Sequence, residues 1–184
     1  MQIELLPFTP DDIERLSSWI RTEDDMVQWS GPYFKFPLQH QDLLDYQHTN
    51  QMTPAIRQIF KAVQQDTGIV VGHIELNDLD FNFRSASISR VLVNPEYRGM
   101  GICLAMINAI LIIAFDQLHL HRLSLRVYDF NRPAIRCYER AGFRREGFFR
   151  HFSRVGDQWW DSWSMAILED EWRALQTHSV QGLP

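Results

Sequence analysis

A glycine-containing turn between two apolar segments has the composition of an anion-binding site. The turn, Arg98-Gly99-Met100-Gly101, follows a strand that ends at Asn94-Pro95 and precedes an apolar run. Glycine lets the backbone approach a ligand without a Cβ atom in the way, and a helix start offers unpaired N–H groups. These features predict a site for a pyrophosphate. A turn that needs glycine for its geometry alone is the alternative, and the segment is neither a Walker loop nor a dinucleotide fingerprint.

Two blocks of the sequence resemble motifs of one enzyme family. Val93-x-Pro95-x-Tyr97-Arg98-Gly99-x-Gly101 resembles motif A of the GNAT superfamily, the acyl-CoA-dependent N-acetyltransferases, although Cys103 stands where that motif has Gly or Ala. The block from Asn131 to Phe143 is similar to motif B, Asn-x-x-Ala-x-x-x-Tyr-x-x-x-Gly-Phe, at every defining position. The resemblance covers Ile69 to Ile167, and the first 60 residues match in element order alone.

This resemblance implies transfer of an acetyl group from acetyl-CoA, the co-substrate, to a primary amine. The amine attacks the thioester directly, and a backbone N–H near Val93 stabilises the tetrahedral oxyanion. Tyr138 then acts as the general acid that protonates the coenzyme A thiolate. The implied coenzyme contacts are the backbone of Val91, Leu92 and Val93 to the pantetheine, the amides of Arg98, Gly99, Met100, Gly101, Ile102, Cys103 and Leu104 to the pyrophosphate, and Asn131.

The general base is less clearly marked than the general acid. An ammonium must lose a proton before it attacks, and Glu75 is the first candidate because it alternates with Ile74 and Leu76 and faces away from them. A solvated strand carboxylate is the alternative, and Asp78 and Asp80 are expected as loop acids. Some family members carry a glutamate on the strand before motif B, where this chain has Arg126. A water chain, or an amine that binds already neutral, therefore remains open.

The acceptor site is expected beside the aromatic loop Trp29–Pro37. Trp29, Tyr33 and Phe34 can form a wall that holds a cation, or they can pin the loop onto the core. Glu23, Asp24 and Asp25 precede this loop and either attract an amine or cap a helix end. The chain looks like the branch with spermidine and ribosomal-protein N-terminal acetyltransferases, which implies a small cationic amine or a peptide N-terminus as acceptor. A drug-like amine is a third option.

A non-catalytic acyl-CoA-binding sensor on the same fold is the alternative function. Cys103 in the phosphate loop and the missing base motivate it, and Tyr138 discriminates, since binding alone does not need it. Cys103 and Cys137 lack a histidine and an acid beside them in the sequence, so small buried residues are expected rather than nucleophiles. His119 and His121 lack partners at metal-ligand spacing, and no metal is expected.

The elements that must position these residues follow from hydrophobic patterning. Helices are expected from Thr9-Pro10, with Ile13, Leu16 and Ile20 on one face, and at 38–48, 101–117, 131–140 and 169–176. Strands are expected at 3–8, 58–64, 69–76, 86–93, 123–127, 143–154 and 158–168. This order predicts a single GNAT-like domain, 1–184, with an α+β (α/β) fold. Helices would flank a mixed, mostly antiparallel central sheet.

Composition sets the remaining expectations. The 184 residues are 45% hydrophobic with a net charge of −5, which suits one globular domain and argues against a nucleic-acid partner. The longest apolar stretch is too short for a bilayer span, and no signal-peptide pattern is present, so no membrane association and a cytoplasmic location are expected. Two cysteines fit a reducing compartment. The edge of the last hairpin allows a homodimer.

Overall fold

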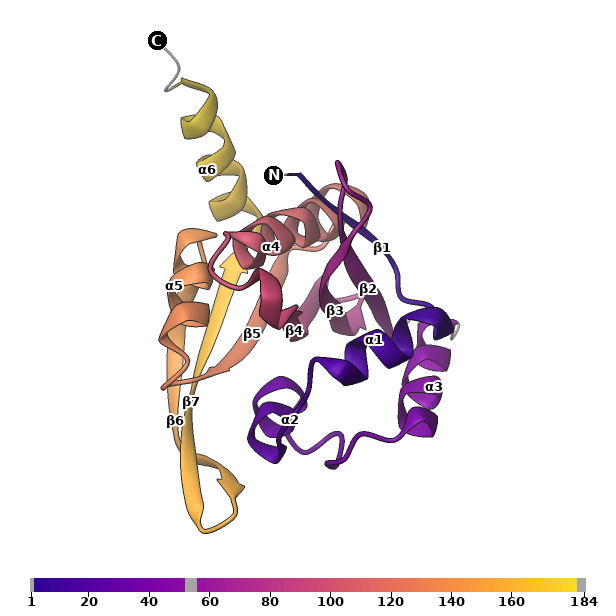
Figure 1. Ribbon diagram of the computed structural model, residues 1–184. Helices are drawn as coiled ribbons and strands as arrows, with labels where there is room; N and C mark the ends of the chain where they lie inside the picture. Colours follow the sequence, from indigo (N-terminus) through magenta and orange to yellow (C-terminus); the bar gives the residue numbers. More distant parts are fainter. Residues whose placement is uncertain (1, 52–55, 182–184) are drawn as a thin grey trace.

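One seven-stranded sheet organises the computed structural model, which describes residues 2–51 and 56–181 (Figure 1). Its order is β1-β2-β3-β4-β5-β7-β6. Every neighbouring pair is antiparallel except β4 with β5, which is parallel. The mixed, mostly antiparallel sheet expected from the sequence is therefore confirmed. The strands are β1 (Ile3–Pro7), β2 (Arg57–Gln64), β3 (Val70–Asp80), β4 (Ser85–Val93), β5 (Arg122–Tyr128), β6 (Arg144–Val155) and β7 (Gln158–Leu168).

The parallel pair of strands separates partway along its length. Residues Ser85–Ile88 of β4 pair with Arg122–Leu125 of β5, and the register ends there. Beyond that point β4 stays paired with β3, and β5 stays paired with β7. A bulge inserts one extra residue into β4 near Arg90, whose φ is 49°. Bulges bend the strand that carries them and end regular pairing, so β4 turns away from β5 here.

Helices α4 (Ile102–Ile112) and α5 (Arg132–Arg140) cover one face of the sheet (Figure 1). The helix predicted from Gly101 to Gln117 is confirmed, with its last turn, Ile113–Gln117, wound as a π-helix. The alternating residues Ile74, Leu76 and Ile88 point toward α4 in one buried cluster. Gly72 allows the close approach, because a Cβ atom there would collide with Met106.

The opposite face carries α1 (Ile13–Ser18), α2 (Glu23–Ser30) and α3 (His40–His48), which group together in Figure 1. Their apolar residues form a second buried cluster with Ile59 of β2. The predicted start at Thr9 is confirmed, where Thr9 and Asp12 form a capping box around the 3-10 turn Pro10–Asp12. The buried residues of the three helices include Ile13, Leu16, Met26, Trp29, Leu43 and Tyr46.

Two expectations for loops are wrong. The segment Trp29–Pro37 is not all loop, because α2 runs through Ser30 and includes Trp29. Thr22 caps α2 by accepting a hydrogen bond from the Asp25 amide, and acidic residues favour a first helical turn. The run 23–25 is therefore a helix start rather than a helix end. Asp78 and Asp80 are not loop acids either, because β3 continues to Asp80.

The C-terminal part adds a long hairpin and a helix. β6 and β7 join through Gly156, whose φ of 56° suits a tight turn. Helix α6 (Glu169–Gln181) follows β7 and extends away from the sheet (Figure 1). Short 3-10 turns at Thr49–Gln51 and Pro95–Tyr97 complete the regular structure of the described residues. None of the helices within 2–51 and 56–181 combines the length and apolar character needed to span a membrane.

Candidate active site

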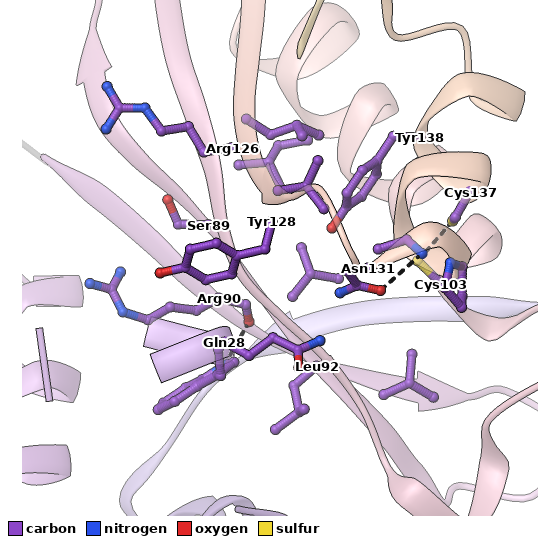
Figure 2. A pocket seen from close by; sticks show the side chains of 18 of the residues that line it. Gln28, Ser89, Arg90, Leu92, Cys103, Arg126, Tyr128, Asn131, Cys137 and Tyr138 are labelled. Carbon is purple, nitrogen blue, oxygen red and sulfur yellow. Dashed lines mark hydrogen bonds between the residues drawn. The ribbon is translucent and has the colours of Figure 1, made fainter. Parts of the chain in front are cut away.

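A cavity of about 1120 Å³ opens where β4 and β5 separate (Figure 2). Its walls come from α2, the ends of β4 and β5, the glycine turn, and the start of α4 and of α5. It brings together residues that lie more than 100 positions apart in the chain. The sequence-predicted residues that line it are Trp29, Val91, Leu92, Val93, Arg98, Gly99, Gly101, Ile102, Cys103, Leu104, Asn131 and Tyr138. Met100 is exposed and lies outside the lining.

The backbone of the glycine turn adopts a conformation that would be strained in a residue with a side chain. Gly99 and Gly101 have φ values of 81° and 80°, in the left-handed region that favours glycine. A Cβ atom at either position would meet no atom within 4 Å, so conformation rather than space requires glycine here. Gly101 is the N-cap of α4 and has no side chain to accept from the first-turn amides. The first turn therefore offers its N–H groups to an anion.

The end of β4 offers a free strand edge to the same cavity. Leu92 and Val93 pair with His73 and Gly72 of β3 on one side. Past Ile88 the register gives β4 no partner in β5 on the other side. An extended ligand can pair with such an edge through backbone hydrogen bonds. The geometry therefore fits a flexible chain whose anionic end reaches the glycine turn.

Tyr138 projects from α5 into the cavity, and its hydroxyl points toward the centre in Figure 2. The residue is 6% exposed, and its hydroxyl has no hydrogen-bond partner in the described part of the chain. Burial, aided by the nearby thiols of Cys103 and Cys137, raises the pKa of Tyr138 well above the usual value for tyrosine. The phenol is therefore protonated at neutral pH and able to donate.

Two further contacts order the start of α5. The side-chain oxygen of Asn131 accepts a hydrogen bond from the Ala134 amide at 3.3 Å and caps the helix, which leaves the NH₂ group of Asn131 for a ligand. The thiols of Cys103 and Cys137 lie 2.7 Å apart and join α4 to α5 (Figure 2). Both cysteines are free thiols. The described residues contain no group of three or more His, Cys, Asp or Glu side chains placed to hold a metal.

Glu75 lies on the predicted side of β3 but does not line the cavity. Its side chain is 0% exposed, because α1–α3 cover this face of the sheet, so the expectation of a solvated carboxylate is wrong. The carboxylate forms an ion pair with Arg90 and accepts a hydrogen bond from the Tyr46 hydroxyl. Burial raises the pKa of Glu75, and the Arg90 guanidinium opposes that rise. The structure does not bring this candidate base to Tyr138.

His73 completes this buried group. Its Nε2 lies 3.1 Å from the Tyr46 hydroxyl, and its ring packs edge-on against Phe8 and Trp29. Burial lowers the pKa of His73 to about 3, with the Arg90 charge acting in the same direction. The imidazole is therefore neutral at physiological pH. We call this buried group the closed cluster; its members are Tyr46, His73, Glu75 and Arg90.

The aromatic wall holds a cation, but that cation belongs to the chain itself. The Arg90 guanidinium lies 4.1 Å from the centre of the Tyr33 ring, and the Arg57 guanidinium lies 5.3 Å from it. Trp29 stacks on Phe34 and donates its indole N–H to the Arg90 carbonyl at 3.0 Å. Trp29 lines the cavity, whereas Tyr33 and Phe34 do not. The contacts of Tyr33 and Phe34 fit the alternative expectation, in which their rings pin the segment onto the core, here at Arg90.

Sequence reasoning missed the polar floor of the cavity. Ser87 and Ser89 of β4 and Ser124 and Arg126 of β5 line it. Ser87 and Ser124 are hydrogen-bonded to each other at 3.0 Å, across the paired part of the two strands. These polar residues alternate with apolar residues along both strands. That period of two in the sequence is the signal that could have revealed them.

Comparison with known proteins identifies the family of this site. The model of the acetyltransferase (GNAT) family matches residues 23–143. An uncharacterized N-acetyltransferase of Bacillus subtilis, YnaD, is 34% identical over 61% of this chain and 65% of its own length. The spermidine N(1)-acetyltransferase of Vibrio cholerae is 30% identical over 56% of this chain and 59% of its own length. The chain thus spans less than two thirds of either relative.

A solved structure shows the same fold. The crystal structure of spermidine N-acetyltransferase from Vibrio cholerae, in complex with CoA and spermine, superimposes with a TM-score of 0.83. The match covers 94% of this chain and 98% of that one, at 22% sequence identity.

Proposed function

The chain belongs to the GNAT family of acetyltransferases, and from that premise we propose that it transfers an acetyl group from acetyl-CoA to a primary amine. One observation carries the proposal. A single cavity is lined by the anion-binding turn at Gly99 and Gly101, by the free edge of β4, and by the protonated phenol of Tyr138. A site that only bound the coenzyme would have no need of the third feature. Relatives named spermidine acetyltransferases support an amine acceptor.

The coenzyme would lie along one side of the cavity. Its pantetheine pairs with the β4 edge at Val91, Leu92 and Val93, and its pyrophosphate accepts hydrogen bonds from amides between Arg98 and Leu104. The Asn131 NH₂ group contacts the coenzyme at the start of α5. The structure of the Vibrio cholerae protein with CoA supports a coenzyme on this fold.

The reaction then balances through one intermediate. The neutral amine forms a C–N bond to the thioester carbonyl carbon, and a backbone N–H near Val93 stabilises the oxyanion. The carbonyl reforms, the C–S bond breaks, and Tyr138 gives its proton to the leaving thiolate. Glu75 is enclosed, so we assign it to holding Arg90 in place. An ammonium first loses a proton to water, or the amine enters neutral. In either case attack leaves a positive charge on the nitrogen, whose proton passes to water as the amide forms, and Tyr138 regains a proton from water.

Thiol release from acetyl-CoA tests this function. Wild-type protein with a panel of amines should release coenzyme A with at least one amine class. Tyr138→Phe keeps the ring and removes the acid, and it should lower kcat about 100-fold or more, while the Kd for acetyl-CoA stays within about threefold.

The two other outcomes separate the alternatives. Equal turnover in wild type and Tyr138→Phe removes the general-acid role. Stabilisation by acetyl-CoA, about 2.7 kcal/mol at a hundred times its Kd, without thiol release for any amine overturns the enzyme and leaves the acyl-CoA sensor. The panel includes peptides with free N-termini, so it also separates a small amine from a protein acceptor.

A further inference from the structure

Arg126 occupies the floor of the cavity at the point where β4 and β5 separate. Ile88 and Leu125 are the last paired residues of the two strands, so Arg126 is the first residue of β5 beyond the paired segment. Its counterpart on β4 is Ser89, next to the bulge at Arg90. Because Leu125 and Val127 point into the core under α4 and α5, Arg126 leaves the sheet on the opposite face. Arg126 and Tyr138 both line the cavity, and Figure 2 shows them on opposite sides of the view, with Ser89 and Tyr128 below Arg126.

The charges around the cavity single out this arginine. Among the described residues the lining has two carboxylates, Asp25 and Asp78, and six arginines. Arg90 is paired with Glu75 and Arg122 with Glu146, so two of the six charges are neutralised. The other arginines of the lining besides Arg126 are on the glycine turn and α5, beside the proposed coenzyme phosphates: Arg98, Arg136 and Arg140.

Arg126 has no carboxylate partner within the described part of the chain, and aromatic rings support its position. Its guanidinium lies 5.0 Å from the ring centre of Phe152 and 5.7 Å from that of Phe149. A guanidinium supported on ring faces keeps the N–H donors at its planar edge available. That edge matches the two oxygens of a carboxylate in a bidentate hydrogen-bonded pair. The small hydroxyl side chains of Ser89 and Ser124 beside it leave room for such a group.

We propose that the amine acceptor also carries a carboxylate, which Arg126 binds; the acceptor is an amino acid or a closely similar small molecule. This inference rests on the proposed acetyl transfer. The acceptor amine lies toward the thioester, between Arg126 and Tyr138, and its carboxylate lies on Arg126. A polyamine has no anionic group to offer, and the unpaired guanidinium repels its charges. The acceptor class therefore differs from the one named in the spermidine acetyltransferase relatives.

Matched acceptors test the proposal on the full-length protein. Each amino acid is compared with its own amide, which keeps the amine and lacks the carboxylate, and with putrescine and spermidine. The amino acids should show kcat/KM values at least about tenfold above their amides and the polyamines, the range of a charged hydrogen-bonded pair.

Variants of Arg126 then separate binding from structure. Arg126→Gln should raise KM for the amino acids about 10- to 100-fold, leave KM for the amides unchanged, and leave the Kd of acetyl-CoA unchanged. Arg126→Lys keeps the charge without the fork and should restore part of the loss. Arg145→Gln is the matched control, because Arg145 also packs on a ring, Trp163, but lies outside the cavity lining.

Three results overturn the proposal. Turnover of polyamines or amides with a kcat/KM equal to or above that of the amino acids excludes carboxylate recognition. An equal rise in KM for amino acids and amides in Arg126→Gln assigns Arg126 to general packing, and weaker acetyl-CoA binding assigns it to the coenzyme site. In all three cases acetyl transfer itself stands; the absence of thiol release with every acceptor is the separate failure of the proposed function.

Discussion

Two groups of polar residues on the same face of the sheet are built in opposite ways. In the closed cluster, Glu75 is paired with Arg90 and bonded to Tyr46, under the cover of α1–α3. On the cavity floor, Arg126 and Ser89 lie uncovered, and Arg126 has no ion-pair partner among residues 2–51 and 56–181. The two groups adjoin at β4, where Ser89 pairs with Glu75 and the bulge follows at Arg90.

The difference teaches which charges are available for chemistry. A charge taken out of water must be paired, and removing one partner leaves the other uncompensated. The closed cluster satisfies its charges internally, so it positions the strand. On the cavity floor, the hydrogen-bond donors of Arg126 and Ser89 remain available to a ligand. A residue type that suits catalysis, such as Glu75, is thus not catalytic by type alone.

The largest effect should come from breaking the closed cluster. Glu75→Gln leaves the Arg90 guanidinium buried without a counter-charge, and the free energy of unfolding should fall by about 3–5 kcal/mol. Chemical denaturation measures this loss. At a temperature where the variant is folded, its kcat should stay within about threefold of wild type, a change of under 1 kcal/mol in the barrier.

The control for Glu75 is a pair on the surface. Asp116→Asn breaks an exposed ion pair with Arg173, and because exposed pairs contribute little, the loss in the free energy of unfolding should be much smaller than that of Glu75→Gln. A Glu75→Gln variant of wild-type stability whose kcat falls a hundredfold would reverse the assignment and make Glu75 the general base.

The next effect should come from the proposed coenzyme side of the cavity. Gly101→Glu places a negative charge at the N-cap of α4, beside the proposed pyrophosphate, and should weaken acetyl-CoA binding about 100-fold. Calorimetric titration measures the Kd. Gly101→Ala is the control, because it introduces the left-handed backbone strain without the charge. Undiminished binding in Gly101→Glu would remove the anion site from this turn.

A smaller effect concerns acid stability in the closed cluster. The pKa of His73 is lowered from 6.5 to about 3 in the folded protein, so the unfolded state takes up the proton first as pH falls. The stability present above pH 6.5 should therefore decrease by about 2 kcal/mol between pH 7 and pH 5. The His73→Gln variant lacks this titratable imidazole, so its free energy of unfolding should decrease less between pH 7 and pH 5. Glu75 titrates in both proteins, so the difference between them isolates His73.

An exposed histidine provides the comparison for this pH effect. His40→Gln removes a histidine from the exposed surface of α3 and is the matched control substitution. If His73→Gln and wild type lose stability in parallel from pH 7 to pH 5, His73 is not the group that takes up the proton.

The sequence predicted those parts of the site that local patterns define. A left-handed backbone at Gly99 and Gly101 and the apolar face that buries Tyr138 are each encoded within a few residues. The acidic start of α2 was missed because its residues Glu23–Asp25 look like the end of the preceding helix. Local signals therefore recovered the residues that line the proposed coenzyme side of the cavity.

The rest depends on which element covers which face of the sheet. Alternation placed Glu75 opposite Ile74 but carried no information on whether helices cover that side. Likewise, Arg126 faces a cavity because β4 and β5 separate after Ile88, and that separation depends on a bulge between distant segments. The two-residue alternation along a strand assigns each side chain to one face of the sheet. Tertiary packing decides which of the two faces is exposed to water.

The smallest effect is expected from substitution of Tyr33, which lies at the boundary between the closed cluster and the cavity. Its ring lies over the Arg90 guanidinium at 4.1 Å and is half exposed, so Tyr33→Leu should lower the free energy of unfolding by about 1 kcal/mol or less. KM for the amine should stay within about twofold. Phe83→Leu is the matched control, because Phe83 is 81% exposed and should change neither quantity. A tenfold rise in KM at unchanged stability would instead place Tyr33 against the acceptor. Because Arg90 already occupies the ring face, we expect the loss to appear in unfolding and not in KM.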